Sequence, residues 1–400
     1  MRTQIPALLA VLTAFSLPLS HGQNVIAPND GAFNDSYAAP ALEGAASQQT
    51  YSNNFGQVGL NSSAFFRYTT GDDIQSGSSD TGDVISREYG LRFQGIVGDF
   101  ANFSYAPSWQ NYSGGRYSDE FSQSFAGDAA FNAGGWQVTI GQTYSDSSPI
   151  STETAQQTPQ ESWGSRLNGD YRLNSSLSAG LGATYSTRDS EGFNSTESTV
   201  FRGFVSQQLA ADGTVTLSIS KGSDDTNEGF NADLTQYSGT FGYQPSELVY
   251  VSAMLGSQKR SFNIVGAPDL SSTIYSFAAN FTPAPFTEIS IRSDSTVGAS
   301  LFTNQTTESE SLSINLTQRL FDLLSLSLSY GNEKSEYLAA DASNAVARSD
   351  DYDFFDARLS YDLRQNTTLS IFYRDLENQS DDTFFGYDGS QHGIEARVSF

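Results

Sequence analysis

Few side chains in this sequence of 400 residues could do covalent or metal chemistry. It has no Cys and only two His, His21 and His392, which excludes thiol nucleophiles, thiolate zinc sites and mechanisms that need a pair of histidines. The 45 Asp and Glu side chains offer many carboxylate pairs for glycosidase chemistry, but no spacing singles out one pair. We therefore expect no catalytic residue, no metal site and no cofactor.

Arginine and carboxylate side chains recur at alternate positions, opposite apolar residues. In a water-filled lumen they could form a constriction whose transverse field orders water and tunes ion preference. They could instead brace a wall, and the excess of Arg over Lys, 17 to 3, suits bracing because guanidinium groups bind carboxylates with two hydrogen bonds. Both interpretations stay open. The candidates that we expect to face such a lumen are Arg67, Arg92, Arg166, Asp170, Arg202, Arg292, Asp294, Asp356, Arg358, Arg374 and Arg397, with Glu88 and Glu395 beside them.

Acidic clusters mark several segments between these positions, for example Asp72-Asp73, Asp224-Asp225 and Asp381-Asp382. They could attract cations or bind divalent ions that bridge anionic lipid head groups, or they could be solvated loop surface, which we favour. The segment 223–229 lacks the spacing of an EF-hand. Arg116, Arg260 and Arg348 are the bases that we place in these acidic loops.

The elements that position these residues alternate with period two. The segment 324–330 reads Leu-Ser-Leu-Ser-Leu-Ser-Tyr, and 177–185 and 215–220 repeat the pattern. One face is apolar and the other small and polar, which is typical of strands with two different environments.

Eighteen such strands are predicted. They cover 58–70, 85–96, 101–112, 119–131, 136–145, 162–173, 176–188, 196–209, 214–222, 232–243, 248–259, 271–282, 287–298, 307–320, 324–334, 351–363, 368–378 and 389–400. The connections after even-numbered strands are short and the others mostly longer and polar. This alternation predicts an all-β, antiparallel up-and-down transmembrane β-barrel of about 18 strands, or 16 if the first hairpin lies outside it. Pro107 lies inside the third strand, where it predicts a bulge or an early strand end.

The N-terminus predicts secretion. Arg2 gives a positive start, 7–19 an apolar run, and Ser20-His21-Gly22 a cleavage site, so we assign 1–22 as a signal peptide. The polar segment 23–57 is expected to be a periplasmic tail or a segment inside the lumen, and 58–400 the barrel. Elsewhere no apolar run reaches the ~18 to 20 residues of a membrane helix.

Charge and composition narrow the partners. The formal net charge is -25, with 20 Lys plus Arg against 45 Asp plus Glu, which argues against nucleic acid because phosphate contacts need bases. The aromatic content of 13% argues against a disordered chain. Membrane-facing positions are apolar everywhere, so no strip of wall singles out a subunit interface.

The last strand, 393–400, alternates through Ile394, Ala396 and Val398 and ends in Phe400. Here the sequence resembles Gram-negative outer-membrane β-barrel proteins, and within them porins of the β-barrel porin 2 type. The resemblance implies a place in the outer membrane, in contact with its lipid and lipopolysaccharide. It also implies that Phe400 is the C-terminal signal read by the barrel-assembly machinery.

The predicted function is a porin-like channel for passive diffusion of ions or small polar solutes, and not an enzyme. Strand numbers near 18 leave an aqueous channel unless something fills it. The alternatives are a structural or adhesive barrel whose lumen is plugged by 23–57, and a barrel that exports a polysaccharide.

Overall fold

The computed structural model describes residues 49–53, 56–72, 83–98, 100–113, 117–210, 212–227, 231–264, 266–339 and 346–400. Within these ranges the regular elements are all strands. No described segment forms a helix long and apolar enough to cross a membrane. The predicted signal peptide 1–22 and most of the predicted segment 23–57 lie outside the described residues.

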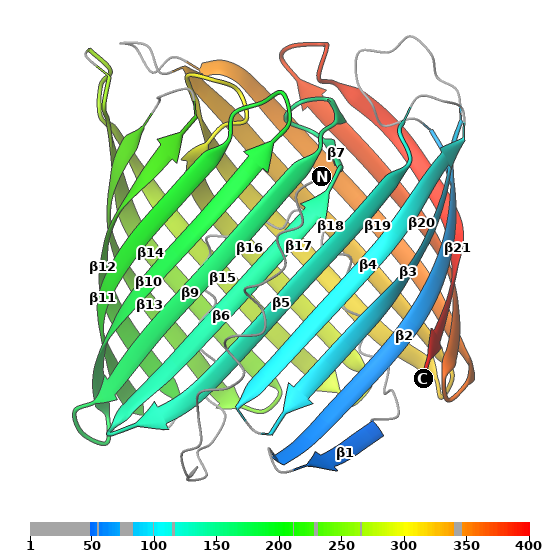
Figure 1. Ribbon diagram of the computed structural model, residues 1–400, viewed down its shortest axis with the longest axis horizontal. Coiled ribbons are helices and arrows are strands. Elements are labelled where there is room, and N and C mark those ends of the chain that lie inside the picture. The colour runs from blue at the N-terminus through cyan, green and yellow to red at the C-terminus, as the bar shows by residue number, and fades with distance from the viewer. Residues whose placement is uncertain are drawn as a thin grey trace.

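Eighteen strands close into one antiparallel barrel (Figure 1). Each pairs with its neighbours in the chain, and β2 also pairs with β21, which closes the ring. Eighteen strands, and not sixteen, therefore form the wall. They are β2 (Gly56–Gly71), β3 (Val84–Val97), β4 (Ala101–Ser113), β5 (Glu120–Ala133), β6 (Trp136–Ser147), β9 (Gln160–Arg172), β10 (Leu177–Ser190), β11 (Thr196–Ala210), β12 (Gly213–Thr226), β13 (Ala232–Ser246), β14 (Val249–Phe262), β15 (Leu270–Ala284), β16 (Thr287–Ala299), β17 (Gln305–Phe321), β18 (Leu324–Ala339), β19 (Val346–Arg364), β20 (Thr367–Ser380) and β21 (Tyr387–Ser399).

Every predicted strand corresponds to one of these, and the strand ends differ from the prediction by at most five residues. The connections alternate as predicted: those of two to four residues meet at one end of the barrel and those of five to twelve at the other. We call these the short-turn end and the long-loop end. Figure 1 shows the short-turn end at the bottom.

The outward face of the wall is apolar. Leu181, Leu217 and Leu255 are each about two-thirds exposed (64–65%), and Phe201 is 63% exposed. A wall of exposed large apolar side chains is expected only against lipid, because soluble proteins rarely carry so extensive a patch. The residues that alternate with them face the interior, where Glu395 is only 3% exposed.

Aromatic side chains pair across strands on the outward face. Tyr89 stacks on Trp109 with 5.7 Å between ring centroids, and Trp136 lies 5.2 Å from Tyr171 near the short-turn end. Rings with an apolar body and a polar tip suit the boundary between hydrocarbon and water.

Strand β1 (Gln49–Asn53) occupies the edge of β2 beyond the end of β21. β21 pairs with β2 from Ser63 upward, Phe400 N donates to Ser62 O (2.8 Å), and β1 pairs with 56–60. The C-terminus therefore lies at the short-turn end, and β1 partners a length of β2 that β21 does not reach.

The expectation of a bulge or early strand end at Pro107 was wrong. β4 runs unbroken to Ser113 and the register with β3 does not shift, but the pairing lapses between Tyr105 and Ser108. The backbone nitrogen of Pro107 carries no proton, so the ladder loses one hydrogen-bond donor. This loss does not require the extra residue that a bulge would insert. Gly90 lies against this gap, where an added Cβ would be 2.8 Å from Pro107 O.

The close approach at Gly90 generates a prediction about stability. Gly90→Ala should lower the free energy of unfolding by about 1–3 kcal/mol, because the new methyl would meet the Phe65 ring and the backbone of Pro107. Gly59→Ala is the matched control, since its Cβ would meet nothing within 4 Å. The stability of both variants is measured by heating samples and following the loss of the folded band on a gel. Equal midpoint temperatures for the two variants would contradict the packing argument.

Candidate functional site

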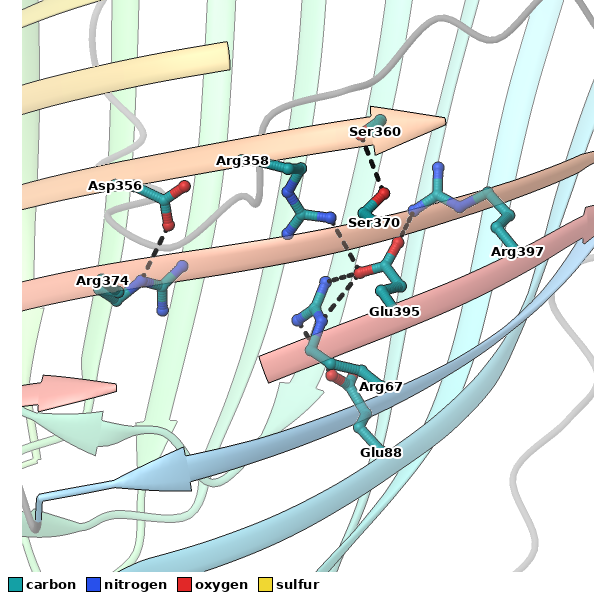
Figure 2. Close-up of polar contacts among 9 residues, drawn as sticks. All are labelled: Arg67, Glu88, Asp356, Arg358, Ser360, Ser370, Arg374, Glu395 and Arg397. Carbon is teal, nitrogen blue, oxygen red and sulfur yellow. Dashed lines mark hydrogen bonds and ion pairs between the residues drawn. The ribbon is translucent and has the colours of Figure 1, made fainter. Parts of the chain in front are cut away.

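The carboxylate of Glu395 is the centre of a charged cluster on the interior wall (Figure 2). Its Oε2 accepts from Arg67 Nη2 (2.7 Å) and Arg358 Nη1 (3.1 Å), and its Oε1 accepts from Arg397 Nη2 (3.0 Å). The same Arg67 also reaches Glu88 on β3 (3.1 Å). The side chains of Glu395 and Arg358 are only 2% and 6% exposed, so these bonds form away from bulk water.

This cluster crosses the seam that closes the barrel. Arg67 on β2 is the register partner of Glu395 on β21 and of Glu88 on β3. Arg358 reaches the same carboxylate from β19, with β20 in between. Side chains from the first and last wall strands, 328 residues apart in sequence, are thus tied by charge-assisted hydrogen bonds.

A second row lies beside it on β19 and β20. Arg374 Nε donates to Asp356 Oδ2 (3.1 Å), and the hydroxyls of Ser360 and Ser370 are 2.9 Å apart. Figure 2 shows this row next to the Glu395 cluster.

The remaining predicted residues are spread around the wall. Arg292 pairs with Asp294 (2.9 Å) and Arg166 with Asp128 (2.9 Å). Asp170 accepts from the Ser178 hydroxyl (3.1 Å), and the Arg202 guanidinium lies over Phe204, 5.3 Å from the ring centroid. Arg92 lies on β3 opposite Ser63. The structure therefore gathers seven predicted side chains around Glu395 and its neighbouring row, and leaves Arg166, Asp170, Arg202, Arg292 and Asp294 apart. The seven are Arg67, Glu88, Asp356, Arg358, Arg374 and Arg397, with Arg92 within electrostatic reach of Arg67, Glu395 and Arg397.

The long-loop end is crossed by the connection 148–159, which includes the short strands β7 (Ile150–Ser151) and β8 (Gln156–Gln157). The carboxylate of Glu153 accepts from Ser300 Oγ (2.5 Å) and from Leu301 N (2.6 Å) in the connection between β16 and β17. Six wall strands separate the two connections on one side and eight on the other. The connection therefore spans the barrel opening to the nearly opposite wall, and Figure 1 shows β7 at this end.

Arg348 fixes the same connection from β19. Its Nη2 donates to Glu153 O (3.1 Å) and pairs with Asp350 (3.1 Å). Its guanidinium lies between the rings of Tyr337 and Phe385, 3.8 and 3.7 Å from the centroids. Cation–π contacts with two aromatic faces, away from water, fix the position of this guanidinium group.

Other donors hold the β16–β17 side of this contact. Arg260 pairs with Asp224 (2.5 Å) and donates to Val297 O (2.7 Å). Asn194, 1% exposed, donates from Nδ2 to Ser300 O (3.2 Å) and from its backbone to Leu301 O (2.8 Å). The described connections 148–159, 191–195 and 300–304 therefore contact one another at this end.

A closed ring of hydrogen-bonded strands, apolar outside and charged within, has its polar backbone satisfied only by closure. The chain is a transmembrane β-barrel.

No protein-family model matches the sequence, and no curated protein matches it. Among solved structures, the outer membrane protein OpdK from Pseudomonas aeruginosa is 12% identical with a TM-score of 0.44, over 85% of this chain and 98% of that one. OccK11 (OpdR) from the same organism is 9% identical with a TM-score of 0.42, over 85% and 96%. The siderophore receptor PirA from Acinetobacter baumannii is 8% identical with a TM-score of 0.43, over 85% and 80%. At these values the likeness says nothing about a substrate.

The sequence placed Arg260 and Arg348 in solvated loops, which was wrong. Both lie on strands, β14 and β19, and are buried at 5% and 7% exposure. The strands extend further toward the long-loop end than the alternation indicated, and their arginines turn inward to bind loop backbone. The sequence analysis did not identify Asp128 or Glu153. The residues that accompany Asp128 on its face of the wall, such as Ala130 and Gly141, are small and gave no signal. Glu153 lies in a loop, where no periodic pattern marks a carboxylate.

Glu395 generates a prediction about stability. Glu395→Gln should lower the free energy of unfolding by about 3–5 kcal/mol, because it leaves Arg67, Arg358 and Arg397 without their shared carboxylate. Asp294→Asn is the control: its partner Arg292 is 49% exposed, so the loss should be about 0–1 kcal/mol. Urea unfolding from lipid vesicles, followed by tryptophan fluorescence, measures both. Similar losses would show that the Glu395 cluster does not brace the seam.

Glu153 generates a prediction about the loops. Glu153→Ala should raise the rate of proteinase K cleavage within 148–159 severalfold, because the carboxylate that holds Ser300 and Leu301 is gone. Glu288→Ala, an exposed change at the short-turn end, should leave the rate unchanged. Unaltered cleavage in Glu153→Ala would mean that other contacts fix this connection.

Proposed function

We propose that this chain is a porin-like outer-membrane channel through which ions or small polar solutes diffuse passively. The observation that carries the proposal is the closed 18-stranded wall, apolar outside and charged inside. Barrels of 16 to 18 strands are wide enough to hold an aqueous channel.

The way the interior charges are paired supports the same role. Arginines of the wall meet carboxylates of the wall, such as Arg67 with Glu395 and Arg374 with Asp356. Pairing along the wall satisfies the charges without a filled interior, so the lumen keeps room for water. Bracing and pore lining are thus compatible: paired side chains such as Arg292 and Arg166, 49% and 37% exposed, still present polar atoms to a solute.

The crossing connection 148–159 would make the long-loop end the narrow part of the path. Its contacts with the β16–β17 connection and with Arg348 hold it over the opening. Selection would then occur at the mouth, before a solute reaches the wall arginines.

The cellular placement that we propose follows the sequence. Residues 1–22 direct secretion, Phe400 is read by the barrel-assembly machinery, and the apolar wall contacts outer-membrane lipid and lipopolysaccharide. The short-turn end, where the C-terminus lies, would face the periplasm.

One observation favours the alternative of a closed structural or adhesive barrel. The long-loop end is packed, with Thr158 and Ser300 fully buried and Leu301 2% exposed. A mouth covered in this way would present loops to a surface polymer and pass little solute. Nothing in the wall specifically favours polysaccharide export.

Single-channel conductance in a planar bilayer separates these roles. The refolded barrel should show steady openings, and a salt gradient should give a reversal potential of cation preference, because most of the interior arginines named above pair with carboxylates while the chain carries a net charge of -25. Glu153→Ala should increase the conductance, and Glu288→Ala should not. A silent membrane from a barrel that still migrates as folded on a gel would favour the closed barrel.

A further inference from the structure

A cavity of about 900 Å³ lies at the long-loop end, apart from the Glu395 cluster. The ends of β6, β9 and β10 form one side, and the β10–β11 and β16–β17 connections form the other. Its volume is in the range of small-molecule sites.

Its charge is of one sign. Asp146, Glu161, Asp189 and Glu191 line it, and no Lys, Arg or His does so among the described residues. Elsewhere in the described barrel, arginines and carboxylates meet in ion pairs; none of the ion pairs seen in the described chain includes these four.

Three of these carboxylates stand side by side. Glu161 on β9 is the register partner of Asp146 on β6 and of Asp189 on β10. Like charges directly opposite each other across strands are destabilising. A bound cation would remove this repulsion, so the arrangement is more stable occupied than empty.

The other side of the cavity is aromatic. The rings of Phe193 and Phe302 meet edge to face with 5.7 Å between centroids, next to buried Leu301. Aromatic faces attract cations and bury apolar groups.

The lining of the cavity does not suit a metal ion. The described residues contain no group of three or more His, Asp or Glu side chains close enough to hold one. Carboxylates spread around a cavity with an aromatic side instead match an ammonium group carried on an apolar body.

We propose that this cavity binds organic cations, with the ammonium group among Asp146, Glu161 and Asp189 and the apolar part against Phe193 and Phe302. Binding does not require the barrel to conduct. The further role of the cavity, as the site that captures a cationic solute before it permeates, rests on the proposed function.

Calorimetric titration of the refolded full-length barrel with benzyltrimethylammonium tests the proposal. This cation should bind, while benzyl alcohol and benzoate, of similar shape, should bind much more weakly. Trp163 gives a second readout, because its Nε1 donates to Glu161 (3.2 Å) and its fluorescence should change on binding.

Substitutions locate the site. Glu161→Gln and Asp189→Asn should each weaken binding about fivefold, the effect of one unit charge near 4 Å in water. Glu310→Gln with Glu377→Gln is the matched control, since these exposed carboxylates lie on β17 and β20, away from the cavity, and should leave the affinity unchanged. Gel migration verifies that each variant folds. If a variant does not, the salt dependence of binding to the unaltered chain replaces it, since added NaCl must weaken a cation held by exposed carboxylates.

Equal affinity for benzyl alcohol, an affinity that salt does not change, or an equal loss in the control variant would overturn the proposal. Conductance keeps the two proposals distinct. A silent barrel that binds the cation would support this site and sink the channel, whereas a conducting barrel that does not bind it would do the reverse.

Discussion

The hydrogen bonding of the backbone in hydrocarbon is the constraint on which this structure depends. Water is absent there, so every N–H and C=O of the wall needs a partner, and an open sheet would leave two edges unpaired. The pairing of β2 with β21 removes both edges. Because these strands are the first and last of the wall, closure must join segments that are more than 300 residues apart, at a large loop-closure cost. The Glu395 cluster lies on this seam, where bonds from Arg67 and Arg358 offset part of that cost.

Closure also fixes which residues face lipid and which face the interior. Strand periodicity is two, so one face of every strand must be apolar and the other can be polar. For this reason the sequence predicted the wall closely: alternation identified all eighteen strands, and the short turns gave their antiparallel order. The same rule predicts that Arg358 and Glu395 both face the interior. It does not predict that their side chains contact each other. Their contact depends on register across several strands and on the stagger of the closed ring, neither of which period two encodes.

The long-loop end was predicted least well, for a related reason. A loop has no periodic pattern. No feature of the local sequence therefore distinguishes Glu153, whose connection crosses the opening, from the acidic residues that stay in solvent. Arg348 was placed in a loop because the apolar alternation begins only at 351. In the structure β19 already starts at Val346, and Arg348 in this early part of the strand is held by Tyr337, Phe385 and Asp350. Pro107 is the opposite case, because the local sequence predicted an interrupted strand. The pairing of β4 with β3 and β5 keeps the strand continuous there.

The wall and the cavity at the long-loop end differ in how their charges are compensated. Charges on the wall are mostly compensated within hydrogen-bond distance, so they contribute to stability and little to the field a solute meets. The four carboxylates that line the cavity at the long-loop end have no such ion pairs among the described residues, and they lie on strand ends and connections whose packing the seam does not need. Substitutions there can change what approaches the opening while the closed wall stays intact. Under the proposed function, a solute would be selected at the long-loop end, where the backbone is free of the hydrocarbon constraint, while stability is set in the wall, where the backbone is bound by it.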